Sequence, residues 1–290
     1  MKARYINPYT DFGFKKLFGE EASRDLLVDF LNQLLPARHR IRDLSFKSQE
    51  GLPDTFVERR AIFDIHCQAD NGERFIVEMQ KARQNYFRER TVYYSTFPIR
   101  EQAEAGNWDF KLDAVYCVGI LNFVFDHNDP DPQIVTEVKL RDHRHRVFYD
   151  KLTYIYIQMP VFDKKENELT THFEKWLYFL KHLEDFRDIP AILNEPVFRK
   201  GFNVAEIAAY SPAELNAYED SVKVYRDLKG VMDAALQDGL DKGREEGREE
   251  GKKEGREEGM KAALNEALSN LIASGFTEKD ARRLLKLPEN

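Results

Sequence analysis

Two acidic residues, Asp64 and Glu78, lie in neighbouring apolar stretches, 63–67 and 73–80, which the chain joins through residues 70–72. Carboxylates on directly opposed positions of a β-hairpin have Cβ atoms about 5 Å apart. At that distance they repel each other, and one tends to take up a proton unless a cation lies between them. A hard divalent cation such as Mg²⁺ removes the conflict, activates an attacking water and neutralises charge on a phosphate. The residue types therefore suggest metal-assisted phosphodiester chemistry.

The length of the loop at 70–72 decides whether the two carboxylates meet. A two-residue Asn-Gly turn puts Asp64 opposite Met79 and mixes polar and apolar residues on both faces. A three-residue loop, with Gly72 in the left-handed conformation, puts Asp64 opposite Glu78 instead. The apolar pairs of this second register are Phe63 with Met79, Ile65 with Val77, and Cys67 with Phe75. We predict the second register because it separates an apolar face from a polar one.

A simpler explanation of the hairpin is a solvent-facing edge whose acids stay hydrated, and spacing alone favours it. His66 and Gln80 share the polar face with the two acids. His66 is explained more easily as a hydrogen-bonded neighbour than as a metal ligand. Lys81 points to the opposite face if the strand is regular.

The carboxylates need a scaffold, and the rest of the sequence predicts an α/β fold. Helix-like stretches begin at Thr10 or Asp11, span 23–35 and 85–105, and dominate 170–237. Strand-like stretches cover 41–47, 60–69, 73–80, 115–125 and 152–159. A kink is expected at Pro98 in the long helix, which Gly106 ends. This order of elements predicts a central mixed sheet flanked by helices.

The C-terminal part has a different character, with a glycine at every fourth position from Gly239 to Gly259 and charged residues between them. Six glycines cost a helix roughly 5–6 kcal/mol relative to alanine. Two interpretations remain open: a solvated, semi-flexible spacer, and a self-association helix whose glycines let a second helix approach closely. We predict three parts: a domain over 1–237, the charged repeat over 238–260, and a small helical hairpin over 261–290, whose second helix Thr277 caps.

Several stretches together resemble a known family. They are residues 10–19, the run Val77-Glu78-Met79-Gln80, Arg90 with Tyr93-Tyr94 and Gln102 on the long helix, residues 118–123, and the glycine repeat. A helix, then Asp64, a hairpin and Glu78-x-Gln80 resemble the PD-(D/E)xK nuclease core, with Gln80 in place of the usual lysine. The chain is more closely similar to the Rpn family of recombination-promoting nucleases, also called PD-(D/E)xK family transposases.

The resemblance implies a restriction-endonuclease-like fold with a helical C-terminal extension. It implies DNA cleavage of low sequence specificity that depends on Mg²⁺, with Mn²⁺ as a substitute, in recombination or in defence against foreign DNA. It makes Asp64 and Glu78 the metal ligands, with Gln80 as a third catalytic residue. Gln80 orients a water or a phosphate oxygen but cannot stabilise charge as lysine does.

The resemblance also suggests five supporting residues: Asp11, Lys15, Arg90, Tyr94 and Gln102. Asp11 and Lys15 lie four apart on one helix face and offer an extra acid and a phosphate contact. A helix cap and a surface lysine explain them equally well. Arg90 and Tyr94 also lie four apart and offer a phosphate clamp, whose alternative is an ordinary surface pair.

Bulk properties set limits on these hypotheses. A net charge of −7 argues against a protein that coats nucleic acid non-specifically, although a local basic rim remains compatible with a nuclease. Two cysteines, no apolar leader and no long apolar run predict a cytoplasmic protein without a membrane partner. The alternatives to a DNA endonuclease are a catalytically weak scaffold that binds DNA or protein and self-associates through its tail, and an RNA or nucleotide phosphodiesterase.

Overall fold

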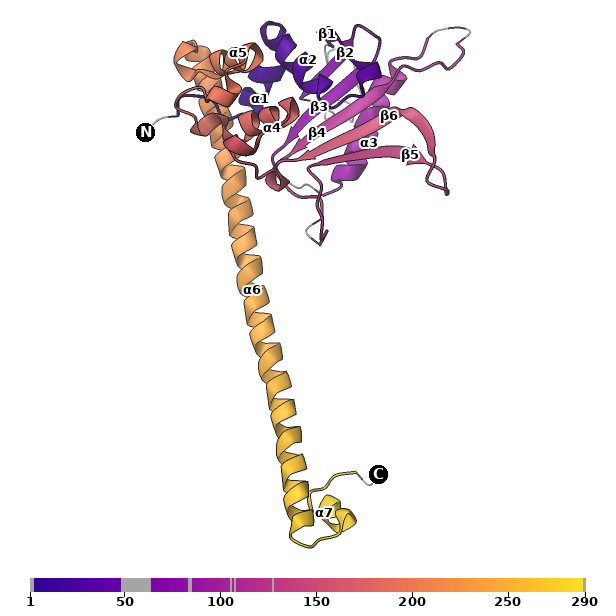
Figure 1. Ribbon diagram of the computed structural model, residues 1–290, viewed down its shortest axis with the longest axis vertical. Coiled ribbons are helices and arrows are strands. Elements are labelled where there is room, and N and C mark those ends of the chain that lie inside the picture. The colour runs from indigo at the N-terminus through magenta and orange to yellow at the C-terminus, as the bar shows by residue number, and fades with distance from the viewer. Residues whose placement is uncertain are drawn as a thin grey trace. The chain divides into compact units, whose positions relative to one another are not determined.

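A six-stranded mixed sheet forms the centre of the fold. The computed structural model describes residues 3–47, 64–82, 85–104, 106, 108–126 and 128–288. The strands are β1 (Leu44–Phe46), β2 (Ile65–Ala69), β3 (Arg74–Gln80), β4 (Val115–Leu121), β5 (Val135–Arg141) and β6 (Val147–Gln158). Their order across the sheet is β1-β2-β3-β4-β6-β5, which can be followed in Figure 1. The β3–β4 and β4–β6 pairs are parallel and the other pairs are antiparallel.

One face of the sheet packs against four helices and carries the larger core. These helices are α1 (Asp11–Phe18), α2 (Arg24–Asn32), α4 (His172–His182) and α5 (Pro196–Ala205). Trp176 of α4 is fully buried among Phe18, Phe30 and Phe198, with ring centroids 4.9 to 5.7 Å away. Alternate strand residues, such as Val77 and Ile120, join this core because strand side chains alternate between faces.

The opposite face packs against α3 (Phe87–Arg100) and carries a smaller core. Ile76, Cys117 and Tyr156 of the sheet join Phe87 and Tyr94 of the helix there. All seven residues of β4 are buried, as expected for a parallel strand covered on both faces. The residues on the α3 side therefore alternate along each strand with those of the larger core.

The chain separates into two compact units, Met1–Tyr225 and Arg226–Asn290. The long helix α6 (Pro212–Ala273) contains the whole glycine repeat and the amphipathic segment after it. A short helix α7 (Glu278–Leu284) follows, and the Thr277 hydroxyl accepts a hydrogen bond from the backbone N–H of Asp280, as predicted. Within the described ranges, no helix combines the length and the apolar character that crossing a membrane requires.

Most elements appear where the sequence predicts them, with three differences. The helix predicted over 85–105 spans Phe87–Arg100 and ends two residues after Pro98. Strand β5 was not predicted, because five of its seven residues are exposed and its side chains mix charged and apolar types on an edge strand. The predicted strand over 60–69 begins at Ile65, and its residues 60–63 lie outside the described residues.

Candidate metal and catalytic site

The β2–β3 hairpin adopts the register predicted from its faces. Ile65 pairs with Val77 and Cys67 pairs with Phe75. The backbone N–H of Ala69 donates to the carbonyl of Glu73 at 2.8 Å, and Gly72 has a φ of 89°. A left-handed residue closes a three-residue hairpin loop, and glycine adopts that conformation without strain. The predicted partner Phe63 lies outside the described residues.

Asp64 lies one step beyond the last strand pair, opposite Glu78 in the same register. Its Oδ2 accepts a hydrogen bond of 2.7 Å from the backbone N–H of Met79, which holds the carboxylate against β3. Burial raises the pKa of Asp64, and the nearby Asp11 carboxylate raises it further. The Met79 N–H and the charges of Lys15 and Lys81 lower this pKa. Asp64 therefore lies near two acids, Asp11 and Glu78, and near two lysines.

Glu78 is 8% exposed and carries the most perturbed carboxyl of the site. Burial, and then the charge of Asp64, raise the pKa of Glu78 to about 7. Its Oε2 accepts a hydrogen bond of 2.9 Å from Gln80 Nε2. Its Oε1 is buried and has no hydrogen-bond partner in the described part of the chain. A buried carboxylate oxygen without a donor is costly, so this atom needs a proton or a cation.

These oxygens fit a divalent cation. Among the described residues, no three His, Cys, Asp or Glu side chains gather closely enough to hold a metal by themselves. Mg²⁺ commonly binds through one or two carboxylates, with waters and substrate phosphates completing its shell. Asp64 and Glu78 provide two such carboxylates, and Oε1 of Glu78, which no described residue hydrogen-bonds, is available as a ligand. The donor set therefore suits Mg²⁺ or Mn²⁺ and not a softer metal.

Helix α1 brings Asp11 and Lys15 to the same end of the hairpin. The Lys15 ammonium lies 3.1 Å from the Asp11 carboxylate, and both charges act on Asp64. The Thr10 side chain caps the helix by accepting from the N–H of Gly13 at 3.0 Å. A Cβ on Gly13 would lie 2.2 Å from the Asn7 carbonyl oxygen, so the start of α1 requires glycine there. The tight packing fixes the first turn of α1, where Asp11 lies.

Helix α3 brings Arg90 and Tyr94 to the site from the other face. Arg90 Nη2 donates to the Tyr94 hydroxyl at 3.1 Å, and the guanidinium lies 5.4 Å from that ring centroid. The charge of Arg90 also lowers the pKa of Glu78, so the guanidinium acts electrostatically on this carboxyl. Tyr94 is 7% exposed, which makes it a packing residue that orients Arg90.

Gln102 is not brought to this site. Its side-chain oxygen accepts from the backbone N–H of Asp113 at 2.7 Å, just before β4 begins. Glu78 and Gln80 pair with Gly119 and Leu121, at the far end of that strand. Because α3 runs antiparallel to β4, a residue after its C-terminal end lies away from the carboxylates. Gln102 instead ties the end of α3 to the sheet.

The structure adds residues to this region that the sequence did not suggest. Lys81 follows the last residue of β3, and its charge lowers the pKa of Asp64. Gly119 pairs with Glu78 on one side and with Tyr156 on the other. A Cβ on Gly119 would lie 3.0 Å from Tyr156 Cδ1, so the tyrosine ring leans over the glycine. A glycine inside an apolar strand was the available signal, since it marks a close approach.

His66 lies away from the carboxylates, as a polar neighbour. It pairs with Ile76 on β3, and its Nε2 is 3.6 Å from Glu101. Burial lowers the pKa of His66. The structure thus places a buried imidazole beside Glu101, away from the two carboxylates.

A family model described as PD-(D/E)XK nuclease family transposase matches residues 8–235. The match includes the β2–β3 hairpin, α1, α3 and the whole sheet. No curated protein and no solved structure matches the chain significantly.

Proposed function

Because this chain belongs to the PD-(D/E)XK nuclease family transposases, we propose that it is a Mg²⁺-dependent DNA endonuclease with Asp64 and Glu78 as its metal ligands. The family supports nuclease chemistry. The observation that carries the assignment of the site is the pair of opposed carboxylates, one of which has a buried oxygen that no residue in the described ranges hydrogen-bonds. We place the protein in the cytoplasm and expect little sequence specificity, with a role in recombination or in defence against foreign DNA.

The proposed reaction is the hydrolysis of a phosphodiester bond by in-line attack of water on phosphorus. When bound, Mg²⁺ supplies Lewis-acid stabilisation of the charge that builds on the phosphate and makes water more acidic. Asp64, held by the Met79 N–H, and Glu78, held by the Gln80 amide, present oxygens in fixed positions. The leaving 3′ oxygen takes its proton from solvent.

Cationic side chains beside the carboxylates support a polyanionic substrate. Lys15 and Lys81 lie close enough to act on Asp64, and Arg90 lies close enough to act on Glu78. The chain as a whole has a net charge of −7, so a group of three cationic side chains at one site differs from its overall acidic character. We assign these three side chains to the phosphates that flank the cleaved bond, because lysine and arginine are among the side chains that hydrogen-bond to DNA phosphates.

The test is nicking of supercoiled plasmid by the purified full chain, with Mg²⁺, with EDTA, and with the variants Asp64→Ala and Glu78→Gln. We expect nicking to need the metal and to fall at least a hundredfold in both variants. Glu73→Gln is the matched control, since Glu73 is a buried glutamate on the same hairpin but at its loop end. Nicking that survives Asp64→Ala would reject this site. A folded protein that never nicks but still binds DNA would favour the scaffold alternative.

We also propose that the tail mediates self-association with a second copy of the chain. Val231, Met232, Leu236 and Leu240 of α6 are exposed by 69%, 38%, 64% and 51%. Met232, Leu236 and Leu240 are four residues apart and share a helix face, and the glycine repeat begins beside them. Apolar side chains next to glycines allow two helices to pack closely, so this segment has the features of a helix–helix contact.

A further inference from the structure

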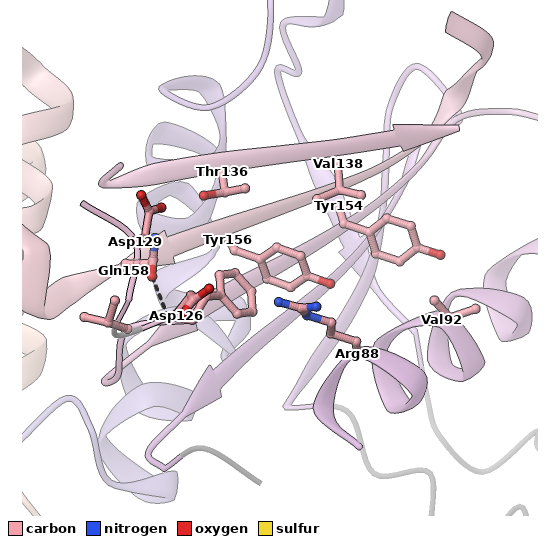
Figure 2. Close-up of a pocket in the computed structure, with 11 residues that line it drawn as sticks. Arg88, Val92, Asp126, Asp129, Thr136, Val138, Tyr154, Tyr156 and Gln158 are labelled. Atoms are coloured by element: carbon pink, nitrogen blue, oxygen red, sulfur yellow. Dashed lines mark hydrogen bonds between the residues drawn. The ribbon is translucent and has the colours of Figure 1, made fainter. Parts of the chain in front are cut away.

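A cavity of about 420 Å³ opens on the α3 face of the sheet, beside the carboxylates but separate from them. Its floor consists of Tyr154, Tyr156 and Thr136 from strands β6 and β5 (Figure 2). Arg88 and Val92, one turn apart on α3, form one wall. The opposite wall is the segment after β4, with Phe125, Asp126 and Asp129. The volume is within the range that holds a small organic molecule.

The cavity and the carboxylates lie on the same face and in the same row of residues across the sheet. Glu78 pairs with Gly119, Gly119 with Tyr156, and Tyr156 with Thr136. Two strand spacings separate Glu78 from Tyr156, which is about 10 Å. Burial raises the pKa of Tyr156, and the charge of Glu78 makes a smaller contribution in the same direction. The Tyr156 ring therefore lies between the proposed metal site and the cavity.

The walls offer flat aromatic surfaces. The rings of Tyr154 and Tyr156 are nearly parallel, at 10°, and extend from the sheet toward α3 (Figure 2). Phe125 stands at 89° to Tyr156 with its centroid 4.8 Å away, so the two rings form a corner. Tyr154 is held by a 2.9 Å hydrogen bond to Ser95, and Tyr156 by a hydrogen bond with Thr91. Fixed aromatic faces of this kind stack well against a planar heterocycle.

The polar groups of the cavity are divided between its walls. Arg88 is exposed, lies 5.8 Å from the Phe125 ring centroid and forms no ion pair with the described residues. Asp126 and Asp129 each use one carboxylate oxygen to accept a backbone N–H two residues ahead. Among the described residues, their other oxygens accept no hydrogen bond and can accept one from a ligand. The site thus presents a cation, two acceptors and aromatic surface in one cavity.

This combination selects among ligand classes. A small anion would meet two carboxylates, and a purely aliphatic ligand would desolvate Arg88 and Asp126 without compensation. A nucleobase is planar and uncharged, carries N–H donors that carboxylates accept, and has an attached phosphate for an arginine. We propose that this cavity binds one unstacked nucleobase of the DNA strand, next to the phosphodiester bond cleaved at Asp64 and Glu78.

The proposal rests on the proposed nuclease function for its biological meaning, but its test does not require cleavage. Binding of dGMP to the full-length protein is measured in EDTA by calorimetry, beside 2-deoxyribose 5-phosphate, which lacks the base. We expect dGMP to bind in the millimolar range or tighter and the sugar phosphate to bind at least tenfold more weakly. Equal binding of the two would show recognition of phosphate alone and would overturn the inference.

Val138→Trp fills the mouth of the cavity, and Val147→Trp is its matched control. Both valines lie in the β5–β6 hairpin and are 44% exposed, but only Val138 lines the cavity. We expect Val138→Trp to weaken dGMP binding at least tenfold and Val147→Trp to leave it unchanged, with both melting as the parent does. Equal binding by both variants, or no binding of dGMP to the parent at about 10 mM, would overturn the proposal.

Plasmid nicking by the same two variants separates this inference from the proposed function. Base-dependent binding that Val138→Trp removes supports the base site whether or not the parent nicks DNA. Loss of nicking in every form, with base binding intact, counts against the nuclease proposal alone. Normal nicking without any base-dependent binding counts against the cavity proposal alone.

Discussion

The side-chain amide of Gln80 donates a hydrogen bond of 2.9 Å to Oε2 of Glu78, two residues earlier on the same strand and the same face. The amide holds the carboxylate but adds no charge beside it. The PD-(D/E)xK core that the hairpin resembles is expected to have a lysine at this position, so we infer that Gln80 positions Glu78 where a lysine would also supply charge.

Gln80→Lys should therefore raise Mg²⁺-dependent nicking, by about tenfold, because an ammonium adds charge stabilisation that an amide lacks. The measurement is the initial rate of plasmid nicking at saturating Mg²⁺. Gln80→Met is the control, since it keeps the side-chain length but removes the hydrogen bond to Glu78, and it should slow nicking. A lysine variant as slow as the methionine variant would mean that the amide itself is required.

The raised pKa of Glu78 predicts a pH dependence of stability in the absence of metal. Its folded pKa, about 7, lies above the unfolded value of 4.5, so the folded state binds a proton more tightly. This contribution is complete below pH 4.5 and is lost as the pH rises through 7. Its size is on the order of 3 kcal/mol at most.

Glu78→Gln, which stays neutral, should then melt at a higher temperature than the parent at pH 8 in EDTA. The two proteins should melt alike at pH 5. Mg²⁺ should raise the melting temperature of the parent at pH 8 and leave that of the variant almost unchanged. Thermal unfolding followed by circular dichroism at the two pH values measures all three. A variant less stable than the parent at pH 8 would contradict the burial of an ionised Glu78.

The hairpin could be predicted because its information is local. Gly72 allows the loop, and only one register places Ile65 opposite Val77 while Asp64 faces Glu78. The helix cap at Thr10 is equally local. In each case a few adjacent residues decide the geometry, so the sequence pattern and the structure agree.

The remaining features depend on contacts that the sequence pattern does not show. Gln102 belongs to the same helical stretch as Arg90, but the antiparallel direction of α3 against β4 carries it to Asp113. Tyr156 reaches the neighbourhood of Glu78 only because β6 pairs with β4 while β5 takes the edge. The strand order is set by long-range pairing, which short-range periodicity does not determine.

Gly119→Ala should destabilise the protein, because the new Cβ would lie 3.0 Å from the Tyr156 ring. The expected cost is about 1–3 kcal/mol, typical of overpacking in a buried position. Gly239→Ala is the matched control, since a Cβ there meets nothing within 4 Å and alanine favours the helix. The midpoint of thermal unfolding should fall for Gly119→Ala. For Gly239→Ala it should rise or stay the same. Equal midpoints for Gly119→Ala and the parent would show that the ring moves aside freely.

Leu236→Lys should reduce self-association of the full chain. The leucine is 64% exposed on α6, between Met232 and Leu240 on one helix face. A second copy packed there would have to bury the new charge, which is costly without a partner. Sedimentation equilibrium of the parent should show a concentration-dependent dimer. The dissociation constant of the dimer should be at least tenfold higher for the variant.

Lys242→Glu, a charge change at a position already exposed and polar, is the control and should leave the equilibrium nearly unchanged. A parent that sediments as a monomer at every concentration would leave the tail as a solvated spacer.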